Sequence, residues 1–460
     1  MRVLLISTYE LGHQPLHVAA PAAELRAAGH EVAALDLAVE SWDSARLDRA
    51  QAVAISVPMH TAMRMATETA IRIRRERPRL PIAFYGLYAA VGSGRVLGRV
   101  ADRLICGEYE DQLVEWVTSL AGSSPATGVT VEIGNRRFVT PDRRDLPGLD
   151  RYAHLELGER RRTVGYVEAS HGCRHRCAHC PIPAVYDGRY RVTGEGAVLS
   201  DIAQLVEAGA AHITFGDPDF LNAPAYSLRL LEEAHSRFGD LTFDITVKVE
   251  HILRHGDVLG RMADCGVIFV TSAVETLDDS ILARLAKGHT AADAAAAVKL
   301  VRQAGMDIHP TWLPFTPWTT AEGVADIARF IWEWDLAPVT DPVQLSIRLL
   351  IPDRSLMLEV EGVDDFLVGY DPGALGYVWR PADPAMDILQ RELAGLAEEG
   401  AATDEPPLRT LERMTSAIAG HAGVSIPVTP ASGDAVRPRL SEPWFCCSEP
   451  TCAQLEVLQR

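Results

Sequence analysis

Three closely spaced cysteines are the residues of this sequence best suited to metal chemistry. Cys173, Cys177 and Cys180 follow one another as C-x3-C-x2-C, shortly after a β-branched run that begins at Val164. Three thiolates on one short loop can each ligate one iron of a cubane cluster, which leaves the fourth iron open to the amine and carboxylate of a small molecule. The spacing therefore predicts a [4Fe–4S] cluster with one reactive iron.

A structural zinc site is the alternative use of these thiolates. Zinc requires a fourth ligand, and His171, His175 or His179 lies close enough in the sequence to supply one. The cysteine spacing and the preceding strand favour the cluster. Zinc remains the alternative at this point.

A second group of cysteines lies at the C-terminal end. Cys446 and Cys447 are adjacent, and Cys452 follows five residues later. Adjacent cysteines form a mutual disulfide only under strain, but together they can chelate a soft, thiophilic atom. The Pro/Ser-rich segment Ser425–Pro443 resists helix formation, so the tail can extend to a distant site. We interpret the three cysteines as candidate catalytic residues that hold a substrate; a disordered tail with incidental thiols is the alternative.

The N-terminal 120 residues alternate short apolar runs with longer amphipathic segments, the pattern of strands followed by helices. The predicted strands are Arg2–Ser7, Glu31–Leu37, Ala52–Val57 and Ile82–Tyr85, and the predicted helices are Pro15–Ala28, Arg64–Arg77 and Asp111–Leu120. This alternation predicts an α/β fold with a doubly wound parallel sheet and helices on both faces. Ligands of such sheets bind at the carboxyl ends of the strands.

Residues 121–155 connect this unit to the cysteine loop. Ala121–Gly128 is rich in Gly, Ser and Pro, and Val129–Val139 predicts a hairpin with Gly134 and Asn135 at its turn. We therefore expect four regions: the α/β unit at 1–120, a linker with a hairpin at 121–155, a barrel at 156–352, and a helical extension with the cysteine tail at 353–460.

Six strand-helix units follow from Val164 and predict a partial (β/α)6 barrel. Its later strands are predicted at His212–Phe215, Leu241–Val249, Val267–Ala273, Ile308–Leu313 and Val343–Leu350, and the helices of the extension at Pro384–Glu399 and Pro407–Gly420. Chemistry in such barrels gathers at the C-terminal ends of the strands. The candidate cofactor-binding residues at these ends are Gly216, Asp217, Lys248 and Glu275.

At the cysteine loop the chain resembles the radical S-adenosylmethionine (SAM) superfamily, whose hallmark is this cysteine spacing after the first strand of a partial barrel. The resemblance implies a [4Fe–4S] cluster, SAM as cofactor, and an external one-electron reductant of the flavodoxin or ferredoxin type. It also implies that His179 contacts the adenine, that Asp217 binds the SAM amino group and that Glu275 accepts from the ribose hydroxyls. For Asp217, a helix-capping role is the alternative.

The N-terminal unit resembles the cobalamin-binding domain that precedes many radical SAM enzymes. Residues Cys106–Glu110 are similar to the glycine-glutamate turn of such domains, and Leu285–Thr290 is typical of proteins that contain them. The D-x-H-x-x-G motif that ligates cobalt in other cobalamin proteins is missing, although His13 and His17 lie after the first strand. The resemblance therefore implies that cobalamin is possible, held without a histidine.

The tail resembles a subgroup with a C-terminal CCAEP signature, or CUAEP where selenocysteine is present. Cys447 stands where relatives carry selenocysteine, and Ser448 replaces the alanine. A related cysteine-tailed subgroup includes enzymes that attach a SAM-derived 3-amino-3-carboxypropyl group to trivalent arsenic. The resemblance thus implies a thiophilic substrate, for which arsenite is the leading candidate.

The charge balance disfavours nucleic acid as the substrate. The 460-residue chain has 62 acidic and 44 basic residues, a formal net charge of -18, whereas phosphate binding needs a basic footprint. No apolar run reaches the length of a membrane span, and the N-terminus lacks the features of a signal peptide. We therefore expect a cytoplasmic protein that acts on a small molecule, with no membrane partner.

Together these features predict a radical SAM transferase that moves the aminocarboxypropyl group of SAM to a small thiophilic substrate held by the tail. A cobalamin-dependent radical SAM methyltransferase acting on a small molecule is the first alternative. A non-enzymatic metalloid-binding protein is the second. Product analysis separates the two enzymes, because methylthioadenosine marks aminocarboxypropyl transfer, whereas 5′-deoxyadenosine with S-adenosylhomocysteine marks radical methylation.

Overall fold

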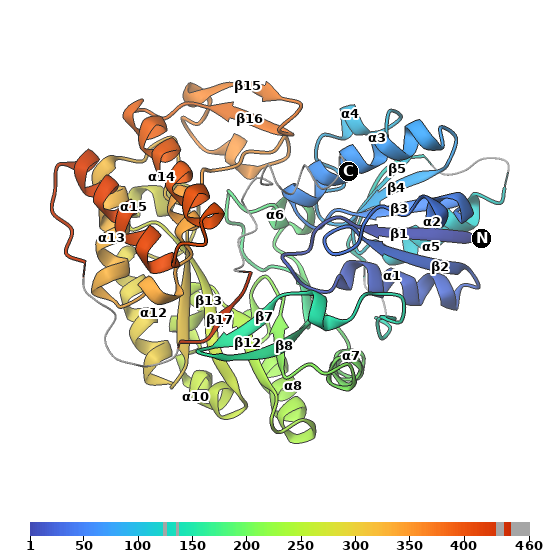
Figure 1. Cartoon of the computed structure of the whole chain (residues 1–460), viewed down its shortest axis with the longest axis horizontal. Coiled ribbons are helices and arrows are strands. Elements are labelled where there is room, and N and C mark those ends of the chain that lie inside the picture. The colour runs from blue at the N-terminus through green and yellow to red at the C-terminus, as the bar shows by residue number, and fades with distance from the viewer. Residues whose placement is uncertain (123–126, 135–137, 429–436, 443–460) are drawn as a thin grey trace.

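The N-terminal unit is a parallel sheet in the order β2-β1-β3-β4-β5-β6 (Figure 1). Its strands are β1 (Arg2–Ser7), β2 (Glu31–Asp36), β3 (Ala52–Ser56), β4 (Ile82–Tyr85), β5 (Arg103–Gly107) and β6 (Gly128–Glu132). Its helices are α1 (Leu16–Ala27), α2 (Ser44–Arg49), α3 (His60–Glu76), α4 (Ser93–Val96) and α5 (Glu110–Ser119). The computed structural model of the chain describes residues 1–122, 127–134, 138–428 and 437–442.

Side chains of these strands alternate between two buried faces. On β1, Leu4 and Ile6 enter the core formed with α2 and α3, whereas Val3 and Leu5 enter the core formed with α1 and α5. The strand is a nearly continuous apolar run because helices cover both faces of the sheet. The predicted doubly wound arrangement is confirmed.

One edge of this sheet differs from the sequence prediction. The predicted hairpin over Val129–Val139 is wrong for its first strand, because β6 pairs in parallel with β5 from Gly128 to Glu132. β5 itself was not predicted as a strand; its open edge offers the backbone partners that β6 uses. Residues 135–137, which include part of the predicted turn, lie outside the described residues.

The second sheet forms half of a barrel in the order β14-β13-β12-β11-β8-β7-β17, with β8 and β11 to β14 parallel. Its strands are β7 (His154–Leu157), β8 (Arg160–Val167), β11 (His212–Phe215), β12 (Thr242–Thr246), β13 (Val267–Glu275), β14 (Asp307–Trp312) and β17 (Arg439–Leu440). The helices between them are α7 (Glu195–Glu207), α8 (Pro224–Arg237), α9 (Val249–Arg254), α10 (Gly256–Asp264), α11 (Asp279–Arg284), α12 (Ala291–Gln303) and α13 (Ala321–Glu333). The predicted partial barrel is confirmed as a fold class.

The sixth predicted strand, Val343–Leu350, is reduced to a single β-bridge between Phe315 and Arg348. A 3-10 turn, Pro342–Ser346, occupies the first half of the predicted segment. Proline supplies no backbone donor for a ladder, so a turn rather than a strand begins there.

The C-terminal extension is helical, as predicted, and packs on the barrel. Helix α15 (Pro407–Ala422) packs against α13, where Trp332 Nε1 donates to Thr415 Oγ1 at 2.9 Å, and α14 (Ala385–Ala402) packs against α15 and the 3-10 turn Pro342–Ser346. An unpredicted hairpin, β15 (Leu367–Asp371) and β16 (Gly376–Trp379), precedes them. Its turn reaches the N-terminal unit, because the carbonyl of Ala374 lies 2.7 Å from His60 Nε2.

A buried arginine in the linker joins the two units. Arg143 donates to both carboxylate oxygens of Asp201 on α7, at 2.7 and 2.8 Å, and to Gln14 Oε1 at 2.9 Å. It also donates to the carbonyl of Tyr166 on β8 at 2.7 Å. The side chains of Arg143 and Asp201 are 7% and 2% exposed, so each charge depends on the other for compensation.

We predict that Arg143→Met destabilises the protein by about 3–5 kcal/mol, because it leaves the Asp201 carboxylate buried without a counter-charge. Denaturant unfolding followed by tryptophan fluorescence measures the loss. Arg144→Met is the matched control, since Arg144 is 71% exposed and its removal is expected to cost less than about 0.5 kcal/mol. Equal stability of the two variants would contradict the prediction.

Candidate active site

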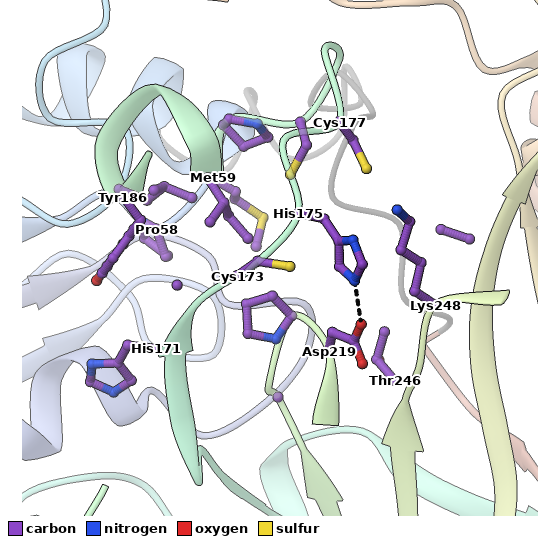
Figure 2. A pocket seen from close by; sticks show the side chains of 18 of the residues that line it. Pro58, Met59, His171, Cys173, His175, Cys177, Tyr186, Asp219, Thr246 and Lys248 are labelled. Carbon is purple, nitrogen blue, oxygen red and sulfur yellow. Dashed lines mark ion pairs between the residues drawn. The ribbon is translucent and has the colours of Figure 1, made fainter. Parts of the chain in front are cut away.

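A cavity of about 270 Å³ lies between the two units, at the carboxyl ends of the strands of both sheets. The N-terminal unit contributes Leu11, Pro58, Met59, Leu87, Tyr88, Gly107 and Tyr109 to its wall. The barrel contributes the cysteine loop and the ends of β11, β12 and β13 (Figure 2). The two predicted ligand sites, at the carboxyl ends of the N-terminal strands and of the barrel strands, therefore share one cavity.

The cysteine loop follows β9 (Ser170–Gly172), and α6 (Ile182–Tyr186) and β10 (Tyr190–Val192) come after it. Gly172 has φ +73°, and a Cβ there would lie 2.5 Å from the carbonyl oxygen of Arg189. Glycine is therefore required where the chain turns into the loop. The turn brings Cys173, Cys177 and Cys180 to the cavity, all as free thiols.

The histidines considered as a fourth zinc ligand are engaged with other groups. His171 Nδ1 lies 3.1 Å from Glu108, His179 Nε2 lies 3.0 Å from Glu275, and His175 Nε2 lies 3.2 Å from His251. Each histidine thus has at least one ring nitrogen turned to another group, although His179 Nδ1 has no hydrogen-bond partner. The three thiols on one loop fit a cluster with one open iron better than tetrahedral zinc.

Burial, followed by the nearby Asp219 carboxylate, raises the pKa of Cys173 to about 11. The thiol is therefore protonated until a cation binds. Iron supplies the positive charge that makes the thiolate stable, so binding of the cluster releases a proton at this position.

Glu275 stands at the end of β13 and forms a buried group with two other side chains. Its Oε1 accepts from His179 Nε2 and from Lys287 Nζ, both at 3.0 Å. Although burial opposes ionisation, the charges of Lys287 and His179 hold the pKa of Glu275 well below its usual range. Glu275 is also a non-glycine residue with φ +72°, a strained conformation of the kind that clusters at functional sites.

The structure does not bring Asp217 to the cavity, in contrast to the expectation for this residue. Its carboxylate accepts from Ala169 N at 2.9 Å and from Ser170 Oγ at 2.5 Å, and it is 2% exposed. Burial raises the pKa of Asp217 to about 7. Gly216 does line the cavity, and so does Asp219 two residues beyond Asp217. Asp219 is therefore the aspartate of this strand end that faces the cavity.

Asp219 belongs to a cluster beside Cys173 (Figure 2). Asp219 Oδ2 lies 2.7 Å from His251 Nδ1 and 3.5 Å from His175 Nε2. Burial opposes ionisation, but these imidazoles lower the pKa of Asp219. Lys248, which also lines the cavity, lies 3.4 Å from Glu250. The two imidazoles and the carboxylate of Asp219 together form a group of ligands that can bind a divalent cation.

Five side chains form an interdomain ion-pair chain that the sequence analysis did not predict, although it considered His17 and His171 for other roles: Glu10, His17, Glu168, His171 and Glu108. His17 lies 3.1 Å from Glu10 and 3.7 Å from Glu168, and His171 lies 3.4 Å from Glu168 and 3.1 Å from Glu108. Burial lowers both imidazole pKa values, but the neighbouring carboxylates prevail and raise that of His17 to about 9 and that of His171 to about 10. Carboxylates and imidazoles alternate along this chain of ion pairs, and the chain connects the N-terminal unit to the barrel. Because the residues that pair across the two units lie far apart in the sequence, no sequence pattern predicts that they pair.

The N-terminal wall of the cavity fits a cobalamin held without a histidine. Apolar and aromatic side chains at the strand ends suit the face of a large flat ring. Both nitrogens of His17 face carboxylates, and His13 is buried, stacked on Tyr166 with ring centroids 4.7 Å apart. His13 does not line this cavity, and both nitrogens of His17 are taken by carboxylates, which agrees with the missing motif.

The candidate cysteines of the tail, Cys446, Cys447 and Cys452, lie outside the described residues. The residues just before them are placed. β17 pairs with β7, and the hydroxyl of Tyr9 donates to Glu442 Oε1 at 2.5 Å. The described chain therefore ends beside the loop that follows β1, whose residues Glu10 and Leu11 line the cavity.

Family models match the two units separately. Residues 167–331 match the radical SAM superfamily, and residues 2–117 match the B12 binding domain. The chain thus combines a B12-binding domain with a radical SAM domain, and it is an enzyme whose cofactors include a [4Fe–4S] cluster and SAM. The prediction of an enzyme is confirmed, and the non-enzymatic alternative is set aside. Neither match includes the tail, so the CCAEP subgroup stays a prediction.

Two solved structures share the fold over most of the chain. The radical S-adenosylmethionine methyltransferase TsrM from Kitasatospora setae has 18% identity and a TM-score of 0.56, with 73% of this chain and 71% of that chain covered. The cobalamin-dependent S-adenosylmethionine radical enzyme OxsB has 13% identity and a TM-score of 0.62, with 86% of this chain and 66% of that chain covered. At these identities the similarity shows the fold.

Curated relatives match shorter parts. The hopanoid C-2 methylase of Rhodopseudomonas palustris (strain TIE-1) is 26% identical over 160 residues, which cover 33% of this chain and 30% of the relative. The tRNA uridine(34) acetyltransferase of Dehalococcoides mccartyi (strain CBDB1) is 34% identical over 73 residues, 16% of each chain. The chain thus spans less than a third of either relative. Among the described residues, no helix is long and apolar enough to cross a membrane.

We predict that replacing Cys173, Cys177 and Cys180 together with alanine abolishes cluster binding, because each thiolate ligates one iron. Iron and sulfide content, with the visible absorption of the anaerobically reconstituted protein, measures the loss. Cys265→Ala is the matched control, since this buried thiol does not line the cavity and its removal should leave the cluster intact. Retention of the cluster absorption by the triple variant would contradict the assignment of these three cysteines as cluster ligands.

Proposed function

We propose that this enzyme is a cobalamin-dependent radical SAM methyltransferase that acts on a small molecule. The observation that carries the proposal is the shared cavity, whose wall includes both the cysteine loop and the strand ends of the B12-binding domain. In such an enzyme the cluster supplies the electron for SAM cleavage, and cobalamin carries the methyl group. In this proposal the substrate binds in the cavity, next to both cofactors.

The chain's own side chains have distinct tasks in this proposal. Cys173, Cys177 and Cys180 hold the cluster, and Asp219 accepts hydrogen bonds from the SAM amino group. Glu275 faces the ribose hydroxyls, where its lowered pKa keeps it an anion that can only accept hydrogen bonds. Gly216, Lys248 and His179 complete this side of the cavity. His179 lies against the adenine, with its ring held by the bond to Glu275.

The comparisons favour methyl transfer over the aminocarboxypropyl transfer that the tail suggested. TsrM is described as a methyltransferase and has been solved with cobalamin and a [4Fe–4S] cluster bound; the hopanoid relative is described as a methylase. Transfer to arsenite has no support from any of these proteins. The absence of a basic footprint still favours a small molecule over nucleic acid as substrate.

We predict that the reconstituted enzyme, given SAM, a one-electron reductant and hydroxocobalamin, forms S-adenosylhomocysteine and 5′-deoxyadenosine. Mass analysis of the SAM fragments measures both products. Methylthioadenosine as the main product would overturn the methyltransferase proposal and restore aminocarboxypropyl transfer. The same assay without hydroxocobalamin is the control, and it is expected to lose S-adenosylhomocysteine.

Binding of the cobalamin can be tested separately. Leu87→Arg places a long cation in the N-terminal wall and should weaken hydroxocobalamin binding at least tenfold in equilibrium dialysis, with the cluster content unchanged. Val129→Arg is the control, because Val129 is exposed on the edge strand β6. Equal affinity in wild type and Leu87→Arg would show that cobalamin does not occupy this cavity.

A second candidate function uses the tail, and the anchoring of Glu442 on Tyr9 favours it. Glu442 contacts the loop whose residues Glu10 and Leu11 line the cavity, and a four-residue stretch such as Glu442 to Cys446 spans at most about 14 Å. A thiophilic atom such as trivalent arsenic binds thiolates in preference to oxygen ligands. In this proposal Cys446 and Cys447 hold such a substrate, and Cys452 completes a trigonal site.

We predict for this candidate that replacing Cys446 and Cys447 with serine leaves cluster content and SAM binding unchanged but removes arsenite-dependent formation of methylthioadenosine. The measurement is made at subsaturating arsenite, where delivery by the tail raises the local concentration most. Cys265→Ser serves as the control for loss of a thiol elsewhere. Full activity of the double variant would exclude the tail as carrier.

A further inference from the structure

Lys287 is a buried cation that none of the steps above uses. Its side chain is 3% exposed, and its Nζ lies 3.0 Å from Glu275 Oε1. The residue lines the cavity together with Cys177 and Cys180. A charge in such a position costs free energy unless it is paired or serves a further purpose.

The backbone fixes Lys287 relative to the cysteine loop. Helix α11 ends at Arg284, and Ala286 adopts φ +52°, which reverses the chain. The amide of Lys287 then donates to the carbonyl of Leu282 at 3.0 Å. One turn earlier, the carbonyl of Leu285 accepts from the amide of Ala178, which lies between Cys177 and Cys180, at 2.9 Å. The loop that carries the lysine is therefore fastened to the loop that carries two of the thiols.

Packing strengthens this attachment. Ala178 and Leu285 are both buried in one apolar cluster, which also contains Ile281 and Leu313. Movement of the lysine relative to the thiols would break this contact and the backbone bond together. The separation between the ammonium and the cysteine loop is therefore set by the fold and not by side-chain rotation alone.

The ammonium stays charged. Burial alone would lower the pKa of Lys287, but the carboxylate of Glu275 and then the thiol groups of Cys177 and Cys180 outweigh burial and raise it. The carboxylate of Glu275 is shared with His179. The ammonium group, on a side chain that is 3% exposed, thus lines the same cavity as Cys177 and Cys180.

We propose that Lys287 raises the reduction potential of the [4Fe–4S] cluster, as a fixed buried cation beside the loop of Cys177 and Cys180. One-electron reduction by an external flavodoxin or ferredoxin type donor adds one negative charge to the cluster and changes no covalent bond. A nearby cation stabilises the reduced state more than the oxidised state, and weak screening in the protein interior makes the effect large. The proposal rests on ligation by the three cysteines and not on the identity of the transferred group.

The negative charge of Glu275 opposes the effect of Lys287 on the reduction potential. The proposal therefore predicts shifts of the potential in opposite directions when either charge is removed. Removing the lysine charge should lower the potential, whereas removing the carboxylate charge should leave the ammonium uncompensated and raise it. A purely structural role of the Lys287–Glu275 pair would not produce shifts of opposite sign, because both substitutions disturb the same contact, and Glu275→Gln removes the charge while it keeps an acceptor oxygen.

We predict that Lys287→Met lowers the ratio of reduced to oxidised cluster at a fixed potential by roughly tenfold, equivalent to about 59 mV for one electron. An anaerobic redox titration of the SAM-free holoprotein, followed by electron paramagnetic resonance, measures it. Lys287→Arg should retain the wild-type potential, and Glu275→Gln should shift it upward. Lys299→Met is the matched control, because this exposed lysine over the ring of Trp334 is screened by water.

An unchanged potential in Lys287→Met, or shifts of the same sign in Lys287→Met and Glu275→Gln, would overturn the proposal. If Lys287→Met alone fails to hold a cluster, the double variant Lys287→Met/Glu275→Gln leaves no unpaired buried charge and must titrate below Glu275→Gln. Iron and sulfide content is measured on every sample. A wild-type protein without a cluster refutes the cysteine assignment, whereas a normal cluster with no shift refutes the role of Lys287 alone.

Discussion

The burial of many ionisable side chains between two units is the constraint on which this structure depends. A buried charge needs a partner, and here the partners of charges on one unit often lie on the other. Glu168 and His171 of the barrel pair with His17 and Glu108 of the N-terminal unit. The two sheets are thereby held with the carboxyl ends of their strands facing a common cavity.

That arrangement gives the cavity two chemically different walls. The N-terminal wall is mostly apolar and aromatic, suited to a broad ring, with Glu10 and His17 as its charged members, whereas the barrel wall carries thiols, imidazoles and carboxylates. The pairs around the cysteine loop also orient it: His179 is held by Glu275, and His175 lies against His251 and Asp219. A substrate in this space meets groups whose rotations are already restricted, which lowers the entropic cost of reaching a reactive geometry.

Sequence patterns predicted the fold well where local and tertiary preferences agree. The strand β1 and the helices of the N-terminal unit follow apolar periodicity, which persists because both faces of the sheet are covered. The predictions were wrong where a partner distant in sequence decides the outcome. β6 became a sheet strand because the edge of β5 was open. The segment Val343–Leu350 differs for a local reason, because a turn begins at Pro342.

The candidate site divides in the same way. The spacing of Cys173, Cys177 and Cys180 determined a three-thiol donor set by itself, because one short loop must bring its own residues together. The roles of Asp217 and Asp219 could not be told apart from sequence, since only the tertiary structure turns the first onto Ser170 and the second toward the cavity. The position of Lys287 beside the cysteine loop and the pairing within the interdomain ion-pair chain were likewise determined by the tertiary structure. Their partners are separated along the chain, and pairing across such separations depends on how the elements pack in three dimensions.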